Sequence, residues 1–369
     1  NISTPAPFQQ DIAICDGNPN IGNNFAYVNY PALIAVVDNN GQNVYFTNSS
    51  GNILYSWYEG QLNYNGVTCD VWWVNIPNGI PANSSITIYM NINSTNTNYY
   101  SQYYPYVGAS PEVIQGYDNG NYTFIVYGYF DNTFDGWSGY RSSTACNYAT
   151  FAPVATPYGI EMLNNNTCEG TYILPPNNWN IPMIPLIVEE AWYYTPAGGA
   201  DANSISLFGN TSNQIYAGRG VVCGGSTPAS NYSIYIQFEY FLGTCNGYGP
   251  GSYLQSAYTN SILNYTSFPD TGGTFYTYLI VNQTYAQTGW YLYNSNQVWI
   301  PLTLLNTGIQ LSYNPQVGNY TYSNLNYNPF QYSTLEIGAG ENVPSYQYVE
   351  WVVARAYPPN GVMPSISIS

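Results

Sequence analysis

The ionisable side chains of this sequence restrict the chemistry that it can perform. Its 369 residues include no His, and its Lys and Arg total 3, which are Arg141, Arg219 and Arg355. A Ser-His-Asp or Cys-His relay needs an imidazole, and a Schiff base needs a lysine amine, so the sequence excludes both mechanisms. It also excludes metal sites that are built on imidazole.

Paired carboxylates are the remaining familiar route to catalysis, because glycoside hydrolases use two Asp or Glu side chains. Candidates in apolar, strand-like runs are Glu189, Glu190, Glu239 and Glu350. Glu189 and Glu190 are consecutive and so point to opposite faces of a strand, and Glu350 can pair with Arg355 or Arg219 instead. No spaced acidic signature joins the four. We therefore expect no catalytic residues and no enzyme, with a glycoside hydrolase as the less favoured alternative.

Asp131 and Asp135 bracket the segment DNTFD, which is rich in carboxylate and amide oxygens. Calcium prefers such oxygen ligands, so a structural calcium ion is the one cofactor that we consider here. The alternative is that both side chains close a turn by accepting backbone hydrogen bonds.

Six cysteines are spread along the chain without a CxxC motif, which favours disulfides formed outside the cytosol over a zinc or redox site. Sequential pairing gives Cys15–Cys69, Cys146–Cys168 and Cys223–Cys245, although fifteen connectivities are possible. N-x-S/T sequons also favour a secreted glycoprotein. They begin at Asn1, Asn48, Asn83, Asn93, Asn121, Asn165, Asn210, Asn231, Asn264, Asn282 and Asn319.

The balance of charges bears on partners and on the medium. Nineteen carboxylates against three arginines give a formal net charge of −16 at pH 7. Binding of nucleic acid is excluded, because neutralising phosphates needs clustered cations. Protonation in acid would remove most of this charge, so we expect an acidic, hot external medium. The alternative is a surface made soluble by amides, hydroxyls and glycans at any pH.

Short β-branched and aromatic runs, separated by Asn, Gly and Pro, predict an all-β protein. Its length predicts two β-sandwich domains, which we place at residues 1–111, with a linker over 93–111, and at 112–369. In the first domain we expect strands in QQDIAIC, PALIAVVD, NVYFTN, NILYSWYEG, TCDVWWVNIP and SSITIYMNI. The chain begins without Met, so we expect that a signal peptide or anchor has been removed, and we find no segment that would span a bilayer.

The stretch VWWVNIPNGIPANSSITIYMNI, preceded by NVYFTNSSGNILYSWYEG, resembles a domain of uncharacterised function in archaeal and bacterial surface proteins, over residues 8–95. A concanavalin A-like lectin/glucanase jelly roll often follows that domain. YFDNTFDGW (Tyr129 to Trp137) looks like its opening, and VEWVVARAYPPNGVMPSIS is similar to the last strand of archaeal members. The resemblance implies that the second, larger domain is such a jelly roll, that Trp351 and Arg355 lie on a central strand, and that such a domain can hold structural calcium.

The two ends of the chain have strand-like patterns without an obvious local partner. Residues 3–14 alternate, and VMPSISIS alternates at the other end. Candidates for pairing with another subunit are Ile2, Phe8, Ile12, Ile366 and Ile368. The alternative for residues 8–14 is the first strand of their own domain, tethered by Cys15.

These observations favour an extracellular structural protein, a subunit of a cell-surface filament or sheath whose partners are copies of itself. The alternative is a carbohydrate-binding or adhesion module, because 9 Trp and 43 Tyr can stack on sugar rings. Tyrosine is so abundant that YYSQYYPY (Tyr99 to Tyr106) does not stand out from its background.

Overall fold

The computed structural model describes residues 2–19, 25–64, 66–141, 153–164, 170–176, 184–195, 201–209, 235–242, 251–256, 261–267, 273–281, 285–292, 316–321, 332–340 and 345–369. They form two compact units. Of these residues, unit 1 comprises those up to Ile125 and Arg355–Ser369, and unit 2 comprises the rest. Unit 1 therefore includes residues 112–125 and 355–369, which the sequence analysis assigns to the second domain.

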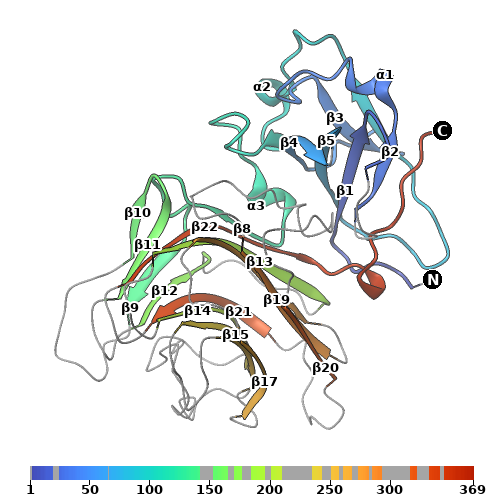
Figure 1. Ribbon diagram of the computed structural model, residues 1–369. Helices are drawn as coiled ribbons and strands as arrows, with labels where there is room; N and C mark the ends of the chain where they lie inside the picture. The colour runs from blue at the N-terminus through green and yellow to red at the C-terminus, as the bar shows by residue number, and fades with distance from the viewer. Residues whose placement is uncertain are drawn as a thin grey trace. The chain divides into compact units, whose positions relative to one another are not determined.

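Unit 1 is a small β-sandwich with three short helices (Figure 1). Its elements are β1 (Phe8–Cys15), β2 (Tyr27–Asn29), α1 (Pro31–Ile34), β3 (Val44–Asn48), β4 (Ser56–Tyr64), β5 (Val67–Ile76), β6 (Ile88–Ile92), α2 (Tyr99–Tyr103), β7 (Val107–Ala109), α3 (Gly120–Thr123) and the 3-10 turn η1 (Pro359–Gly361). One sheet has the order β2-β1-β5-β4-β7, and the other pairs β3 with β6. The rings of Phe46 on β3 and Trp72 on β5 pack at 5.9 Å between the two sheets.

Both faces of β1 are buried along its whole length. Phe8 and Ile12 face the same side, as the alternation predicts, and they are 0% and 6% exposed. Gln9 and Asp11 on the opposite face are also fully buried. The strand pairs with β5 from Phe8↔Ile76 to Cys15↔Cys69, and with β2 on its other side. Residues 8–14 are therefore a strand of their own domain.

Two predictions for this unit are wrong. PALIAVVD contains the short helix α1 instead of a strand, because Pro31 at the first helical position favours a turn and removes a ladder donor. The expected linker over 93–111 contains α2 and β7, and β7 pairs in parallel with β4.

The last residues of the chain complete unit 1 by packing around β1. The backbone N–H of Ala356 donates to Gln9 Oε1 (2.9 Å), and Gln10 Nε2 donates to the carbonyl of Pro364 (3.0 Å). Met363 is 4% exposed. VMPSISIS, which the sequence predicts as a strand, forms none within the described residues, and Figure 1 shows it running past unit 1 as coil.

Unit 2 is built from two large sheets that lie one over the other (Figure 1). Its strands are β8 (Val126–Tyr129), β9 (Ser138–Arg141), β10 (Val154–Thr156), β11 (Gly159–Asn164), β12 (Gly170–Leu174), β13 (Leu186–Thr195), β14 (Asp201–Gly209), β15 (Tyr235–Leu242), β16 (Gly251–Ser256), β17 (Ser261–Ser267), β18 (Gly273–Val281), β19 (Tyr285–Leu292), β20 (Gln316–Thr321), β21 (Tyr332–Gly340) and β22 (Ser345–Ala356), whose last two residues count with unit 1. The sheet orders are β10-β11-β22-β13-β18-β19-β20, with β8 beside β22, and β17-β16-β15-β14-β21-β12-β9.

The fold class predicted from the sequence is confirmed: the chain is all-β and its units are sandwiches. Strand β22 lies inside its sheet, between β11 and β13, so Trp351 is on a central strand as the resemblance implies. Within the described residues, no helix is long and apolar enough to cross a membrane.

Candidate functional site: a row of exposed tyrosines on unit 1

Three tyrosine rings are stacked at one end of the five-stranded sheet. We call Tyr55, Tyr106 and Tyr122 the tyrosine row. The ring centroids of Tyr55 and Tyr106 are 4.7 Å apart with an interplanar angle of 15°, and those of Tyr55 and Tyr122 are 5.4 Å apart at 16°. Tyr106 and Tyr122 are 43% and 47% exposed. The stacked rings cover their inner faces, so the row presents the outer faces and the edges of Tyr106 and Tyr122 to solvent in a defined arrangement.

Strand geometry sets the spacing of the first two rings. Tyr55 directly precedes β4 and Tyr106 directly precedes β7, and the two strands pair in parallel with Ser56 opposite Val107. Neighbouring strands lie about 4.8 Å apart, which matches the separation of these two rings. Tyr122 comes from α3, whose backbone is held by a hydrogen bond from Asn75 Nδ2 on β5 to the Tyr122 carbonyl (3.2 Å).

Asn119 is a positioning residue for the row. Its Nδ2 donates to the carbonyl of Ser56 (3.0 Å) and to that of Pro105 (2.9 Å), which directly adjoin Tyr55 and Tyr106. The side chain is fully buried. One amide thus fixes the two backbone segments that carry neighbouring rings.

Asp118 connects the same three segments through further hydrogen bonds. Its Oδ1 accepts hydrogen bonds from Trp57 Nε1 (3.0 Å) and from the backbone of Gly120 (3.1 Å), and its carbonyl accepts one from the Tyr104 hydroxyl (2.9 Å). Each of these partners lies two residues from a member of the row. The close approach also explains a glycine in β7, because a Cβ on Gly108 would lie 2.3 Å from the Tyr117 carbonyl and 2.4 Å from Asn119 Oδ1.

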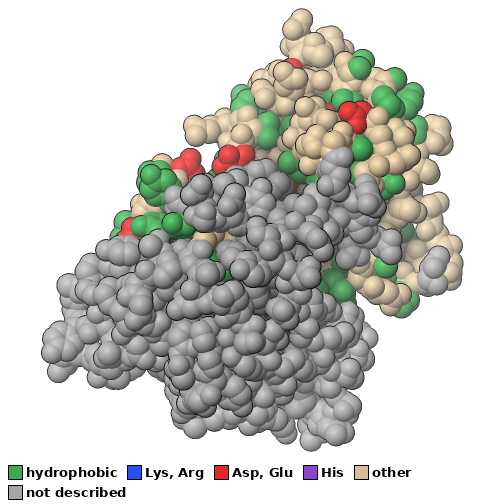
Figure 2. Space-filling view, viewed as in Figure 1, with side chains coloured by type: hydrophobic (Ala, Val, Ile, Leu, Met, Phe, Trp, Pro, Cys, Tyr) green, Lys and Arg blue, Asp and Glu red, His purple; other side chains and the backbone are tan. Residues whose placement is uncertain are grey.

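The surroundings of the row are uncharged or acidic. Partial burial, together with the neighbouring hydroxyls of Tyr106 and Tyr122, raises the pKa of Tyr55 above its ordinary value, so the phenol stays neutral. Figure 2 shows a described surface on which uncharged side chains dominate and no Lys or Arg is visible in that view. Arg355 is 1% exposed and is not available to a ligand.

A second tyrosine group lies on α2 and β3. The rings of Tyr99 and Tyr103, four residues apart on the helix, stack at 5.4 Å and 17°. The ring of Tyr45 on β3 lies 4.6 Å from Tyr99 and 5.1 Å from Tyr103. The segment Tyr99 to Tyr106 thus divides its rings between two clusters. Sequence reasoning missed the tyrosine row because its members are 51 and 16 residues apart, and no local signal joins them.

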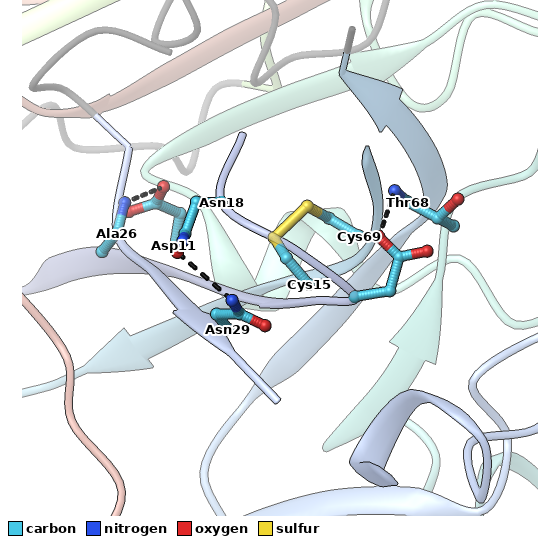
Figure 3. The surroundings of a disulfide bond; sticks show 8 residues. Asp11, Cys15, Asn18, Ala26, Asn29, Thr68 and Cys69 are labelled. Atoms are coloured by element: carbon cyan, nitrogen blue, oxygen red, sulfur yellow. Dashed lines mark hydrogen bonds between the residues drawn. A yellow bond between two sulfur atoms is a disulfide. The ribbon is translucent and has the colours of Figure 1, made fainter. Parts of the chain in front are cut away.

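The expected disulfide between Cys15 and Cys69 is present and joins β1 to β5 (Figure 3). Asp16 Oδ1 accepts a hydrogen bond from the Thr68 backbone (2.9 Å), and Asp11 Oδ2 accepts one from Ala26 (3.0 Å). Phe25 and Tyr64 belong to the same buried apolar cluster as both cysteines. The other four cysteines, Cys146, Cys168, Cys223 and Cys245, lie outside the described residues.

The candidate catalytic carboxylates do not form an open site where they are described. Glu189 and Glu190 on β13 are both fully buried. The Tyr276 hydroxyl donates to Glu189 Oε1 (2.7 Å), and the Thr277 hydroxyl donates to Glu190 Oε2 (3.3 Å). Glu350 is half-buried on β22. Glu239 lies on β15, opposite Ser204 and Tyr253, and its side chain is outside the described part.

Asp131 and Asp135 make hydrogen bonds within their own turn. Asp131 Oδ1 accepts from Asn132 Nδ2 (2.9 Å), and Asp135 Oδ2 accepts from the backbone of Tyr129 (3.3 Å). Among the residues that the structure describes, no group of three or more His, Cys, Asp and Glu could hold a metal ion. Calcium at this turn stays a prediction.

Four sequon asparagines have described side chains. Asn83, Asn93 and Asn121 are exposed, whereas Asn48 Oδ1 accepts hydrogen bonds from the backbone of Ser50 and Asn52. Asn264 and Asn319 lie on β17 and β20, with side chains outside the described part. The remaining sequons begin at residues outside the described ranges: Asn1, Asn165, Asn210, Asn231 and Asn282.

The candidates for pairing between subunits divide into buried and exposed residues. Phe8 and Ile12 are not available for pairing with another subunit, because both side chains are buried in their own domain, on a strand that pairs with β5 along its whole length. Thr4 pairs with Ile80 through its backbone N–H (3.0 Å). Ile2 and Ile368 are 64% and 53% exposed, and Ile366 is half-buried.

Comparisons with known proteins identify a curated protein that is similar in sequence and several solved structures that are similar in fold. No family model matches the chain. The chain is 26% identical over 326 residues to "Uncharacterized protein 562" of Sulfolobus islandicus rod-shaped virus 1, and the match covers 85% of this chain and 49% of that protein. The chain thus spans about half the length of this relative.

Solved structures that resemble 60% or more of the chain include sugar-bound lectins. Winged bean acidic lectin complexed with methyl-alpha-D-galactose gives a TM-score of 0.42 at 10% identity, covering 62% of this chain and 95% of the lectin. Lectin UEA-II complexed with galactose gives 0.41 at 8%, covering 63% and 99%. The exoplasmic/lumenal domain of VIP36 in its Ca2+/Man2-bound form gives 0.37 at 7%, covering 63% and 88%. All three scores are below 0.5, so this likeness carries nothing about what the chain binds.

Proposed function

We propose that this chain is a non-enzymatic binding module of an extracellular protein, and that unit 1 binds neutral carbohydrate through the tyrosine row. The observation that carries the proposal is the exposed, nearly parallel alignment of Tyr106 and Tyr122 on either side of Tyr55. A sugar ring packs its apolar C–H face on an aromatic ring, while its hydroxyls bond to polar groups at the ring edge. Phenol hydroxyls can both donate and accept such bonds.

The charge of the chain selects the class of carbohydrate. An anionic glycan would find few cationic partners at any pH, because the chain has only three arginines, and near pH 7 the formal net charge of −16 would also repel it. Arg355 is buried. Neutral hexoses and their oligomers fit the tyrosine row, because stacking and hydroxyl hydrogen bonds need no cation. We place the protein outside the cell, in an acidic and hot medium, where a disulfide persists.

Glycan-array binding followed by calorimetric titration with the best neutral oligosaccharide tests the proposal. Tyr106→Ala and Tyr122→Ala each weaken binding by about tenfold or more, which corresponds to about 1.4 kcal/mol. Tyr89→Ala is the matched control, because Tyr89 is 52% exposed but lies on β6, outside the row. Absence of binding to any glycan, or equal losses in all three variants, contradicts the proposal.

Self-association into a filament or sheath is the second candidate function. It is favoured by the exposure of Ile2 and Ile368 near the two ends of the chain. Negative-stain imaging of native material tests it, because filaments and isolated particles are immediately distinguishable. Isolated particles at high concentration would contradict this second candidate and leave carbohydrate binding unaffected.

A further inference from the structure

One sequon of unit 1 contains a member of the tyrosine row. Asn121, Tyr122 and Thr123 form an N-x-T sequon, and Tyr122 is one of the two outer rings of the row. The other sequons with described asparagine side chains have Ser as their middle residue, at Ser49, Ser84 and Ser94. Among these four sequons, Asn121 is therefore the acceptor asparagine that is directly followed by an exposed aromatic residue.

The local structure leaves both side chains accessible. Asn121 is exposed, and Tyr122 is 47% exposed. Side chains of consecutive helical residues point about 100° apart, so it is the sugars extending from the Asn121 amide, not the amide itself, that reach the Tyr122 ring. The backbone there is fixed, because Asn75 Nδ2 bonds to the Tyr122 carbonyl and the Tyr122 N–H bonds to the carbonyl of Asn119 (2.9 Å). A glycan at Asn121 therefore starts from a defined position beside the row.

We infer that Asn121 carries an N-linked glycan whose first sugars pack on the outer face of Tyr122, and that this glycan regulates access to the tyrosine row. The regulatory part of this inference rests on the proposed function, which is that the tyrosine row binds carbohydrate. The attached glycan has the same chemistry as the proposed ligand, and its local concentration is high because it is tethered. It therefore competes with free carbohydrate for the row, and an unoccupied Asn121 leaves the row open.

The experiment compares native glycosylated chain with the variants Asn121→Gln and Asn83→Gln. Asn83 is the matched control, since it is an exposed sequon asparagine in the loop before β6, with φ of 52°. Glycopeptide mass spectrometry establishes occupancy. Nitration of Tyr122 by tetranitromethane, quantified by peptide mass, then measures how far the ring is covered without any added sugar.

We expect Asn121 to be occupied and Tyr122 to be nitrated several-fold faster in Asn121→Gln than in the native chain, with no change in Asn83→Gln. Binding of free oligosaccharide should strengthen in Asn121→Gln alone. An unoccupied Asn121, or equal nitration rates in all three proteins, overturns the inference. If nitration responds as expected but no form binds free carbohydrate, the glycan contact stands and the proposed function fails. If all forms bind equally well with equal nitration, the proposed function stands and this inference fails.

Discussion

The middle of the five-stranded sheet of unit 1 buries charged side chains. The end of that sheet that carries the tyrosine row exposes uncharged ones. In the middle, Asp11, Glu59 and Arg355 are at most 1% exposed. Arg355 lies over the Trp73 ring, with 5.0 Å between Cζ and the centroid, and Trp73 Nε1 donates to Glu59 Oε2 (2.8 Å). At the end, uncharged rings are exposed and a buried amide, Asn119, holds them.

This difference separates the residues that hold the fold from those that can bind. Buried charges are costly unless they are compensated, and in the middle of the sheet the charge of Arg355 acts on Asp11 while Glu59 accepts a hydrogen bond from Trp73. Exposed rings gain little from folding, so their alignment needs dedicated hydrogen bonds. The end with the row is therefore where a ligand can act, and the middle is where substitutions should unfold the unit.

The largest expected effect is on the middle of the sheet. Arg355→Met removes the buried cation that acts on Asp11 and lies over the Trp73 ring, and it should destabilise unit 1 by about 3–5 kcal/mol. Hydrogen exchange of the β5 amides in the full chain measures this loss. Asp11→Asn is the control and should cost far less. A loss under about 1 kcal/mol for Arg355→Met would show that the stability of the middle of the sheet does not depend on this cation.

The second prediction concerns pH. Burial raises the pKa of Asp11 from 3.8 to about 8, although the Ala26 hydrogen bond and Arg355 oppose the shift; Glu59 adds to it. Burial also raises the pKa of Asp70 to about 6, against its hydrogen bond from Tyr58. The folded state thus keeps protons that the unfolded state loses above pH 4.

The contribution of Asp11 and Asp70 to the free energy of unfolding is therefore fully present below about pH 4 and is lost as the pH rises to about 8. Between pH 5 and pH 8 the change should reach up to about 4 kcal/mol for Asp11. Thermal unfolding across this range measures it, and Asp11→Asn should flatten the slope. An unchanged slope in that variant would assign the pH dependence to other groups.

The third prediction tests the support of the row. Asn119→Ala removes the donor from two backbone carbonyls and should destabilise unit 1 by about 2–3 kcal/mol. It should also weaken the tyrosine signal in near-ultraviolet circular dichroism and reduce carbohydrate binding. Asn52→Ala, at an exposed asparagine, is the control and should change neither. Retained binding in Asn119→Ala would show that the row orders itself without this amide.

The smallest effect is expected inside the row. Tyr55→Phe keeps the central ring and its stacking but removes the hydroxyl that lies beside Tyr106, and it should weaken binding by about 0.5–1 kcal/mol. Calorimetric titration measures the change. A larger loss than that of Tyr106→Ala would mean that hydroxyl bonding, not ring stacking, dominates recognition.

Local sequence patterns correctly predicted most strands of unit 1 and its disulfide. The runs containing β1, β3, β4, β5 and β6 are strands as predicted, and the pair Cys15–Cys69 is linked. The short helix at Pro31–Ile34 was missed, because an apolar run of this length fits a strand or a helix equally well. The octapeptide VMPSISIS alternates like a strand but docks through Gln10 instead of joining a sheet.

The candidate site could not be predicted in the same way. Tyr99 and Tyr103 are neighbours on one helix, whereas Tyr55 and Tyr106 meet only because β4 and β7 pair in parallel. Parallel pairing needs a long crossover, so it brings together residues that no short motif contains. The chain also has 43 tyrosines, so the sequence does not indicate which of them lie together in the fold.

The sequence by itself determined the class of fold and the excluded chemistry, because strand patterns are local and missing residue types cannot be supplied by folding. The tertiary structure alone decided which charges are buried and which rings are exposed. The charge of Arg355 acts on Asp11 from 344 residues further along the chain, and the tyrosine row is assembled from three separate segments. Both outcomes depend on contacts between distant parts of the chain, whose closure no local pattern records.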